Sequence, residues 1–220
     1  MTSPLDGPST PTGAGGRSPS APRVPAAPDA ASAPAPAAEG AATLGPDWVL
    51  GADGLRFRRA ARVLLLDEQD RLLLVRGHDA DQPERSWWFT VGGGIDPGED
   101  ARSAAVREVR EETGLELDPA ALVGPVLTRS AVFDFFAEHC RQDEEFFLAR
   151  VGAPPAVEDL ARDGWTAVEL DLLDELRWWH LADLERETLE VFPPGLPGLA
   201  RRLLGGWDGV TRHLGLQHDD

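Results

Sequence analysis

Three glutamates, Glu108, Glu111 and Glu112, stand close together in the stretch "REVREETG" (107–114). Like charges at this spacing repel and lend an isolated helix no stability. At about 100° per residue, however, a helix places all three carboxylates within one arc of about 100°. An arc of carboxylate oxygens on a rigid element suits a hard cation such as Mg²⁺. The spacing therefore indicates metal chemistry, with a solvated acidic helix face as the simpler alternative.

A run of glycines just before this helix adds exposed backbone groups. Residues 88–95, "WFTVGGGI", predict a short strand that ends in the glycines. A glycine carbonyl can bind a metal, and a glycine amide can approach a phosphate. The Ala-rich segment that follows predicts a helix from Glu99 to Thr113, with Gly114 as its C-terminal cap. Strand, glycine turn and helix together could hold a metal beside a phosphate.

The rest of the chain interleaves strand and helix patterns. Residues 61–75 are two apolar runs around a polar turn, which predicts a β-hairpin with buried strands, and residues 76–87 read as a loop. Further predictions are strands at 125–135 and 144–151 with a turn at 137–143 between them, a loop at 151–164, a strand at 175–181 entering a helix at 182–190, and a last helix at 196–204. The interleaving indicates an α/β or α+β fold.

Composition divides the chain into three parts. Residues 1–45 hold nine of the 19 prolines and no aromatic residue, so we expect a disordered Ala/Pro/Gly-rich tail. Residues 46–210 contain the tryptophans and branched aliphatics of one folded domain, and residues 211–220 are expected to form a flexible C-terminus. No apolar run is long enough for a membrane span, and we expect no signal peptide.

Charge and cysteine content narrow the possible functions. With 21 basic and 38 acidic residues the net charge is −17, which argues against duplex nucleic acid as a partner. A small phosphate substrate remains compatible, provided that a metal supplies local positive charge. The lone Cys140 rules out an intrachain disulfide and fits a cytoplasmic location. No base lies near it in the sequence, so we expect an inert thiol.

The glutamates belong to a longer pattern that starts at Gly93. The chain reads G, five residues, Glu99, seven residues, then "REVREETGL" (107–115). This resembles the Nudix box, G-x5-E-x7-R-E-U-x-E-E-x-G-U with U aliphatic, and every specified position matches. Val91 stands where many members have proline. Residues 50–205 resemble the family, which implies an α/β/α sandwich around a mixed sheet and Mg²⁺- or Mn²⁺-dependent hydrolysis of a nucleoside diphosphate linked to another group, X.

The resemblance also implies roles for individual residues. Glu108, Glu111 and Glu112 match the metal-binding carboxylates, and the Gly92 carbonyl would be a further ligand. Glu99 and Arg107 match an ion pair that braces the loop against the helix.

Members of the family differ in the glutamate that takes the proton from the attacking water. Here the candidates are Glu108 within the box and Glu144 or Glu145 in "QDEEFF" beyond it, although an ordinary acidic turn explains the last two equally well.

Residues outside the box would select the substrate. Trp87 and Trp88 could stack on a base or pack in the core, and Arg76 and His78 flank the loop after the hairpin, where they could contact substrate. The nucleotide and X stay open among nucleoside triphosphates, ADP-ribose-like sugars and other diphosphates. A homodimer is compatible with the sequence.

Two alternatives to hydrolysis are less compatible with the sequence. A catalytically silent ligand-sensing module normally lacks box carboxylates, and all are present here. An isoprenoid diphosphate isomerase carries a catalytic cysteine in a context that Cys140 does not match.

Overall fold

The computed structural model describes residues 44–45, 47–80, 82–136, 138–160, 164–165 and 167–219. The tail predicted over residues 1–45 lies outside these ranges, apart from its last two residues. Within them, no helix is both long and apolar enough to cross a membrane.

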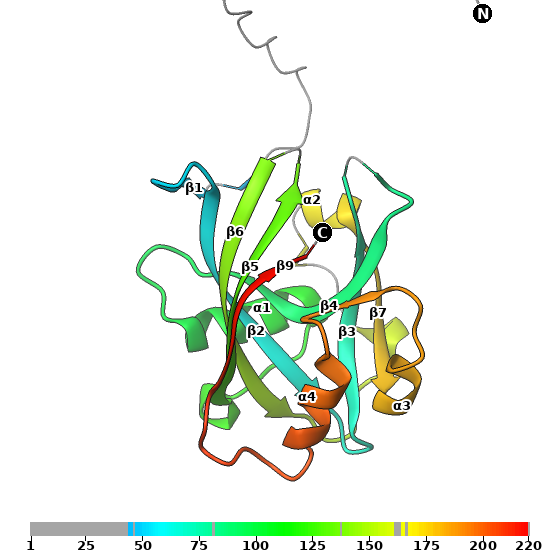
Figure 1. Ribbon diagram of the computed structural model, residues 1–220. Helices are drawn as coiled ribbons and strands as arrows, with labels where there is room; N and C mark the ends of the chain where they lie inside the picture. Colours follow the sequence, from blue (N-terminus) through cyan, green and yellow to red (C-terminus); the bar gives the residue numbers. More distant parts are fainter. Residues whose placement is uncertain are drawn as a thin grey trace, which may run out of the picture. The chain divides into compact units, whose positions relative to one another are not determined.

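The described residues form one mixed sheet of nine strands (Figure 1). The main path runs β7-β3-β4-β2-β6-β5-β9, with β1 beside β2 and β8 beside β4. The pairs β2–β6, β4–β8 and β5–β9 are parallel, and the others are antiparallel. The strands are β1 (Val49–Leu50), β2 (Arg56–Leu66), β3 (Arg71–His78), β4 (Ser86–Gly94), β5 (Val123–Phe135), β6 (Glu138–Arg150), β7 (Leu173–His180), β8 (Glu190–Phe192) and β9 (Arg212–His218).

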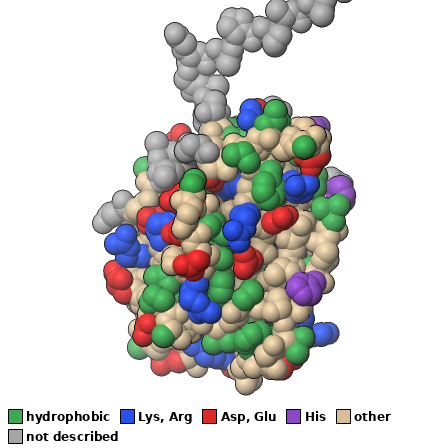
Figure 2. Space-filling model, turned by 90° about the vertical axis from the view of Figure 1, so that its left-hand side faces the viewer, with side chains coloured by type: hydrophobic (Ala, Val, Ile, Leu, Met, Phe, Trp, Pro, Cys, Tyr) green, Lys and Arg blue, Asp and Glu red, His purple; other side chains and the backbone are tan. Residues whose placement is uncertain are grey.

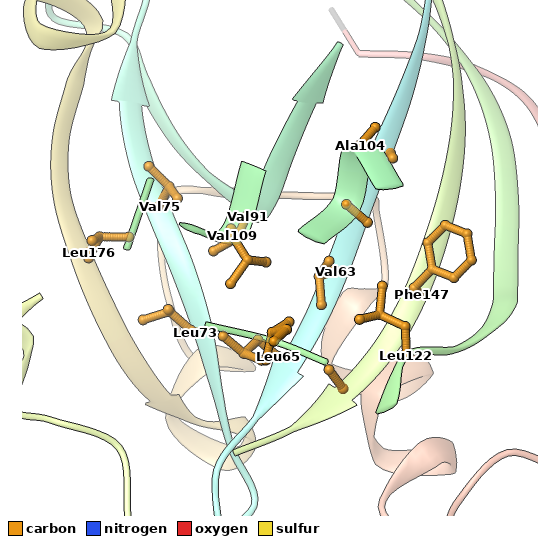
Figure 3. Close-up of a cluster of buried hydrophobic side chains, with 14 of the residues drawn as sticks. Val63, Leu65, Leu73, Val75, Val91, Ala104, Val109, Leu122, Phe147 and Leu176 are labelled. Carbon is orange, nitrogen blue, oxygen red and sulfur yellow. The ribbon is translucent and has the colours of Figure 1, made fainter. Parts of the chain in front are cut away.

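Helices cover both faces of the sheet, as the alternation of side chains along β2 requires. Val63 and Leu65 point into a cluster beneath α1 (Figure 3), whereas Leu64 and Leu66 point into a second cluster with α3 and α4. The helices are α1 (Ala101–Thr113), α2 (Ala167–Leu172), α3 (Leu181–Leu184) and α4 (Leu196–Leu203), with 3₁₀ turns at Pro119–Ala121 and Val157–Asp159. The predicted α/β/α sandwich around a mixed sheet is confirmed.

The predicted hairpin at 61–75 is correct at its turn and wrong beyond it. Strands β2 and β3 meet at Leu66↔Leu72, and β4 then lies between them. Strand β4 pairs first with β3, at Leu74↔Thr90, and then with β2, at Val63↔Val91. Both apolar runs are buried on both faces of the sheet. Their side chains therefore suit any neighbouring strand and do not determine that β2 and β3 pair with each other.

Three further predictions need correction. The turn expected at 137–143 is largely strand, because β6 begins at Glu138 and pairs along β5. The helix expected at 182–190 is the short α3, and β8 begins at Glu190. The C-terminus expected to be flexible at 211–220 contains β9, whose backbone pairs with β5 although none of its side chains is fully buried. Main-chain pairing of this kind leaves little trace in a side-chain pattern.

The surface carries mixed charge on the face shown in Figure 2, where acidic and basic side chains are interspersed. Many arginines of the protein form ion pairs with acidic side chains, such as Arg56–Glu138 and Arg141–Asp53. On the part of this face that the structure describes, basic side chains are interspersed with acidic ones rather than gathered in one patch.

Candidate active site

Helix α1 is fixed at both ends and presents two glutamates to the sheet. The Asp100 side chain accepts the Arg102 and Ser103 amides at 3.0 and 3.1 Å, as an N-terminal cap. Gly114 ends the helix as predicted, with φ +72°. The apolar face of α1 packs in the core, and the same orientation buries Glu108 and Glu112, which are 6% and 4% exposed. Two carboxylates are thus held away from water.

The glycine turn comes within bonding distance of these carboxylates. The Gly92 amide donates to Glu112 Oε2 at 2.8 Å. A Cβ at Gly92, where φ is +130°, would lie 2.2 Å from the Ala61 carbonyl oxygen, and one at Gly93 would lie 2.7 Å from Glu108 Oε2. Glycine is therefore required by the backbone at Gly92, whereas a side chain at Gly93 would displace the Glu108 carboxylate.

A third carboxylate completes a cluster that the box alone does not contain. Single oxygens of Glu108, Glu112 and Glu169 all lie within 4.8 Å of one another. Burial, and then the charge of Glu108, raise the pKa of Glu112 well above its usual value. Burial also raises the pKa of Glu108, although Arg107 opposes the shift. Three buried or half-buried carboxylates this close together repel one another when ionised, and a bound cation would relieve that repulsion.

Glu169 reaches the cluster because the segment before α2 docks on α1. Trp165 Nε1 donates to the Glu112 carbonyl at 3.0 Å. Gly164 packs against the Glu111 backbone so closely that a Cβ would lie 2.5 Å from Glu111 Cα. Glu169 is not among the residues expected from the sequence, because its only signal is that it is acidic, and many residues beyond the box are acidic.

Arg107 connects the other box residues. Its guanidinium pairs with Glu99 at 2.9 Å, so the predicted Glu99–Arg107 ion pair is present, and that hydrogen bond lowers the pKa of Glu99. It also bonds Glu108 Oε1 at 2.7 Å, Glu111 Oε2 at 3.0 Å and the Gly94 carbonyl at 2.9 Å. Glu111 is therefore held by Arg107 at the edge of the site, outside the three-carboxylate cluster, and its role as a ligand stays a prediction.

The Gly92 carbonyl, the other predicted ligand, accepts a hydrogen bond from Arg62 Nη1. Its second lone pair remains for a cation, so this role also stays a prediction.

The two glutamates proposed as distal bases lie on opposite faces of β6 and outside the cluster. Glu144 is buried and accepts from Arg62, Arg129 and Gln142. Burial alone would raise the pKa of Glu144, but the two arginines outweigh it and hold the pKa below its usual value. Glu145 pairs with Arg59 at 2.7 Å. The structure thus brings Glu169, rather than either of these, to the Glu108–Glu112 pair.

Comparison of the chain with known proteins identifies its family. The NUDIX domain model covers residues 56–196, more than half of the chain. The chain belongs to the Nudix family. It is 32% identical over 138 residues to the RNA pyrophosphohydrolase of Erythrobacter litoralis, which covers 56% of this chain and 83% of that protein.

Two further matches are shorter or more distant. A putative 8-oxo-dGTP diphosphatase of Bacillus subtilis is 40% identical over 68 residues, which cover 31% of this chain and 42% of that one. The solved MutT protein of Bacillus halodurans is 19% identical, covers 73% of this chain and 89% of that one, and superposes with a TM-score of 0.48.

The Nudix box residues line a cavity of about 530 Å³. Glu108, Glu112 and Glu169 lie in its wall together with Gly92, Gly93 and Gly94. One group of lining residues comes from the ends of β3 and β4 and includes His78, Arg85, Trp87 and Phe89. Another comes from the opposite face of the sheet and includes Trp48, Arg58, Arg129, Phe133, Gln142 and Glu144. The carboxylate cluster therefore shares one cavity with two groups of aromatic and cationic side chains.

The four residues predicted to contact substrate lie in different parts of the Nudix fold. Trp87 and His78 line the cavity, the latter with Nδ1 at 3.0 Å from Asp174. Trp88 points to the opposite face of β4, where it packs edge-on against Trp179 in the core. Arg76 lies outside the cavity lining and pairs with Asp174 and Glu175. Trp87 and His78 stay as substrate candidates, and Trp88 is explained by packing.

Cys140 is buried, and burial raises the pKa of its thiol to about 11. Because the thiolate is the reactive form, we expect the native protein to react with a thiol reagent such as DTNB at pH 8 about 100-fold more slowly than the unfolded chain. Reaction traces with and without guanidinium chloride would measure this ratio. Equal rates in the two conditions would contradict the buried, protonated thiol.

Proposed function

We propose that the protein is a divalent-metal-dependent hydrolase that cleaves a diphosphate bond of a nucleoside diphosphate linked to another group. The cluster of Glu108, Glu112 and Glu169 carries this proposal, since three carboxylates within 4.8 Å of one another line the cavity. The matched relatives are named as an RNA pyrophosphohydrolase and a putative 8-oxo-dGTP diphosphatase, which supports a diphosphate of the nucleotide class as substrate.

The donor set fits a hard cation, so Mg²⁺ is the expected cofactor, and Mn²⁺ could substitute for it. Only oxygen donors face one another, and the charge of the cluster is not balanced by Arg107 alone. Glu108 and Glu112 would hold the ion, with Glu169 beside it, and the Gly92 carbonyl and Glu111 would be further ligands. A bound Mg²⁺ supplies neutralisation of the diphosphate charge and a lower pKa for water.

The protein's own groups would then orient the reactants. Arg107 fixes the carboxylate of Glu108 at 2.7 Å, and the Gly92 amide fixes that of Glu112 at 2.8 Å, so neither must reorganise when substrate enters. A carboxylate oxygen of Glu169 accepts the proton of a water molecule as that water forms a bond to phosphorus and the bridging P–O bond breaks. Glu169 suits this role because it belongs to a separate element and is less buried than the other two.

A pair of variants distinguishes Glu169 from the distal base predicted on β6. We expect Glu169→Gln to lower kcat by about 10²–10⁴-fold, in the range of a lost general base, and Glu145→Gln to change it by no more than about threefold. Steady-state kinetics at saturating Mg²⁺ would measure both. The reverse order of effects would restore Glu145 as the base and remove Glu169 from the reaction.

The proposed activity is tested with a substrate panel. The purified protein and the Glu112→Gln variant are incubated with nucleoside triphosphates, oxidised nucleotides, ADP-ribose and dinucleoside polyphosphates, with Mg²⁺ or with EDTA, and products are identified by mass spectrometry. We expect Mg²⁺-dependent release of a nucleoside monophosphate or of pyrophosphate from at least one compound. A panel with no metal-dependent turnover would favour the silent ligand-sensing module, and equal turnover by the variant would refute the site.

A further inference from the structure

Arg129, a buried cation of β5, lines the cavity on the side of the sheet opposite α1. Its Nε donates to Glu144, and its Nη1 lies 2.9 and 3.2 Å from the two carboxylate oxygens of Asp219. Asp219 directly follows β9 and lines the same cavity. In the cavity wall, the Arg129 guanidinium is therefore paired with the Asp219 carboxylate, which follows the strand at the edge of the sheet.

Asp219 is the second carboxylate that pairs with Arg129. Glu144 is shared between Arg129 and Arg62, which leaves two guanidinium groups with one carboxylate. Asp219 supplies the second negative charge. Arg62 in turn donates to the Gly92 carbonyl, so a hydrogen-bonded chain links Asp219, Arg129, Glu144 and Arg62 to the glycine turn. Without Asp219, the remaining ion-pair partner of Arg129 would be Glu144, which Arg129 shares with Arg62.

The segment that brings Asp219 is held mainly by its backbone. Strand β9 lies at the edge of the sheet, and its pairing with β5 shifts register between Thr128 and Ser130. None of its side chains is fully buried, and Leu216 is 60% exposed. Moving the end of β9 would cost little apolar burial, in contrast to moving β5 or β6. Of the two counterions of Arg129, Asp219 is therefore the one that can move away at a low cost in apolar burial.

We propose that Arg129 is a binding position for a phosphate group of the substrate in addition to the diphosphate that is cleaved, and that Asp219 occupies this position until the phosphate displaces it. The proposal rests on the proposed function, because it takes the cavity as the substrate site. A phosphate carries more negative charge than the carboxylate, and a guanidinium binds the paired oxygens of either group. Substrates with a further phosphate would exchange with Asp219, whereas substrates without one would leave it in place.

The test measures binding of inorganic phosphate to the full chain by titration calorimetry in EDTA, so that no cation at the glutamate cluster contributes. We expect Asp219→Asn, which keeps hydrogen bonding but removes the charge, to bind phosphate roughly tenfold or more tightly than the wild type. Asp208→Asn is the matched control. It removes the same charge beside β9 from an exposed pair with Arg212, 2.7 Å apart, and should bind phosphate as the wild type does.

A result in which Asp219→Asn binds no more tightly than the wild type would overturn the proposal. So would equal tightening by Asp208→Asn, which would reveal a general effect of net charge. Arg129→Met should abolish the gain when combined with Asp219→Asn, and if that double variant fails to fold, the Asp219 and Asp208 variants still decide. Because phosphate binding is read without turnover, a failed substrate panel would refute the hydrolase and leave this measurement standing.

Discussion

Glu112→Gln is expected to abolish turnover and at the same time to stabilise the metal-free protein. Glutamine keeps an oxygen for the Gly92 amide but removes a charge that is buried beside Glu108. Loss of a ligand of the proposed cation should lower kcat by about 10³-fold or more. Removal of the buried charge should raise the free energy of unfolding in EDTA by about 1–2 kcal/mol, which is several degrees in Tm.

The stabilisation should depend on pH in a defined direction. Because folding raises the pKa of Glu112 above its ordinary value of 4.5, its contribution to stability is fully present below that value and is lost as pH rises through the folded pKa. The Tm difference between variant and wild type in EDTA should therefore grow between pH 5 and pH 8. Thermal melts across this range measure it, with the more exposed Glu111→Gln as the control. If the variant melted at a lower temperature than the wild type at neutral pH, the buried charge of Glu112 would not be destabilising.

Two adjacent glycines should respond to the same substitution in different ways. At Gly92 an alanine Cβ would meet the Ala61 backbone at 2.2 Å, where φ is +130°, so β2 and β4 would have to separate. We expect Gly92→Ala to lower the free energy of unfolding by about 3 kcal/mol or more. At Gly93 the Cβ would meet the Glu108 carboxylate at 2.7 Å, and a side chain moves more easily than a strand. Gly93→Ala should cost about 1 kcal/mol and displace Glu108.

Chemical denaturation measures the stability of both variants, and titration with Mn²⁺ measures the site. Gly93→Ala should remain folded while its Mn²⁺ affinity falls at least about tenfold, in the range of a disturbed metal-ligand environment. Asp208→Asn, a substitution in an exposed ion pair, is the surface control and should leave both the stability and the Mn²⁺ affinity unchanged. If Gly92→Ala were as stable as the wild type, the close approach of β4 to β2 would be wrong.

Local signals made part of this molecule predictable. The cap at Gly114, the helix before it and the glycine turn depend on neighbours in the sequence, and the structure has them where the sequence analysis expects them. The ion pair of Glu99 with Arg107 follows from the box in the same way. These features need no knowledge of distant segments.

The features that sequence reasoning missed depend on contacts between distant segments. Glu169 enters the site because Trp165 bonds a carbonyl of α1, and no spacing within "TAVELDLL" indicates this. Trp87 and Trp88 have the same local pattern, and only the partners of β4 decide which of them faces the cavity. Strand β9 is recognised by its backbone pairing with β5, to which side-chain composition contributes little.

The position of β4 between β2 and β3 also has a consequence for the order of folding. The turn near Leu66 and helix α1 can form from local contacts, whereas β2 pairs with β6 at partners such as Arg56↔Cys140, far apart in the chain. Loop closure makes such pairings late and slow events. Pairing of Gly92 with Arg62 places β4 in the sheet, so we expect that the box can be helical in an intermediate in which the proposed metal site is still incomplete. Acquisition of the proposed metal binding during refolding would then report completion of the sheet rather than formation of the helix.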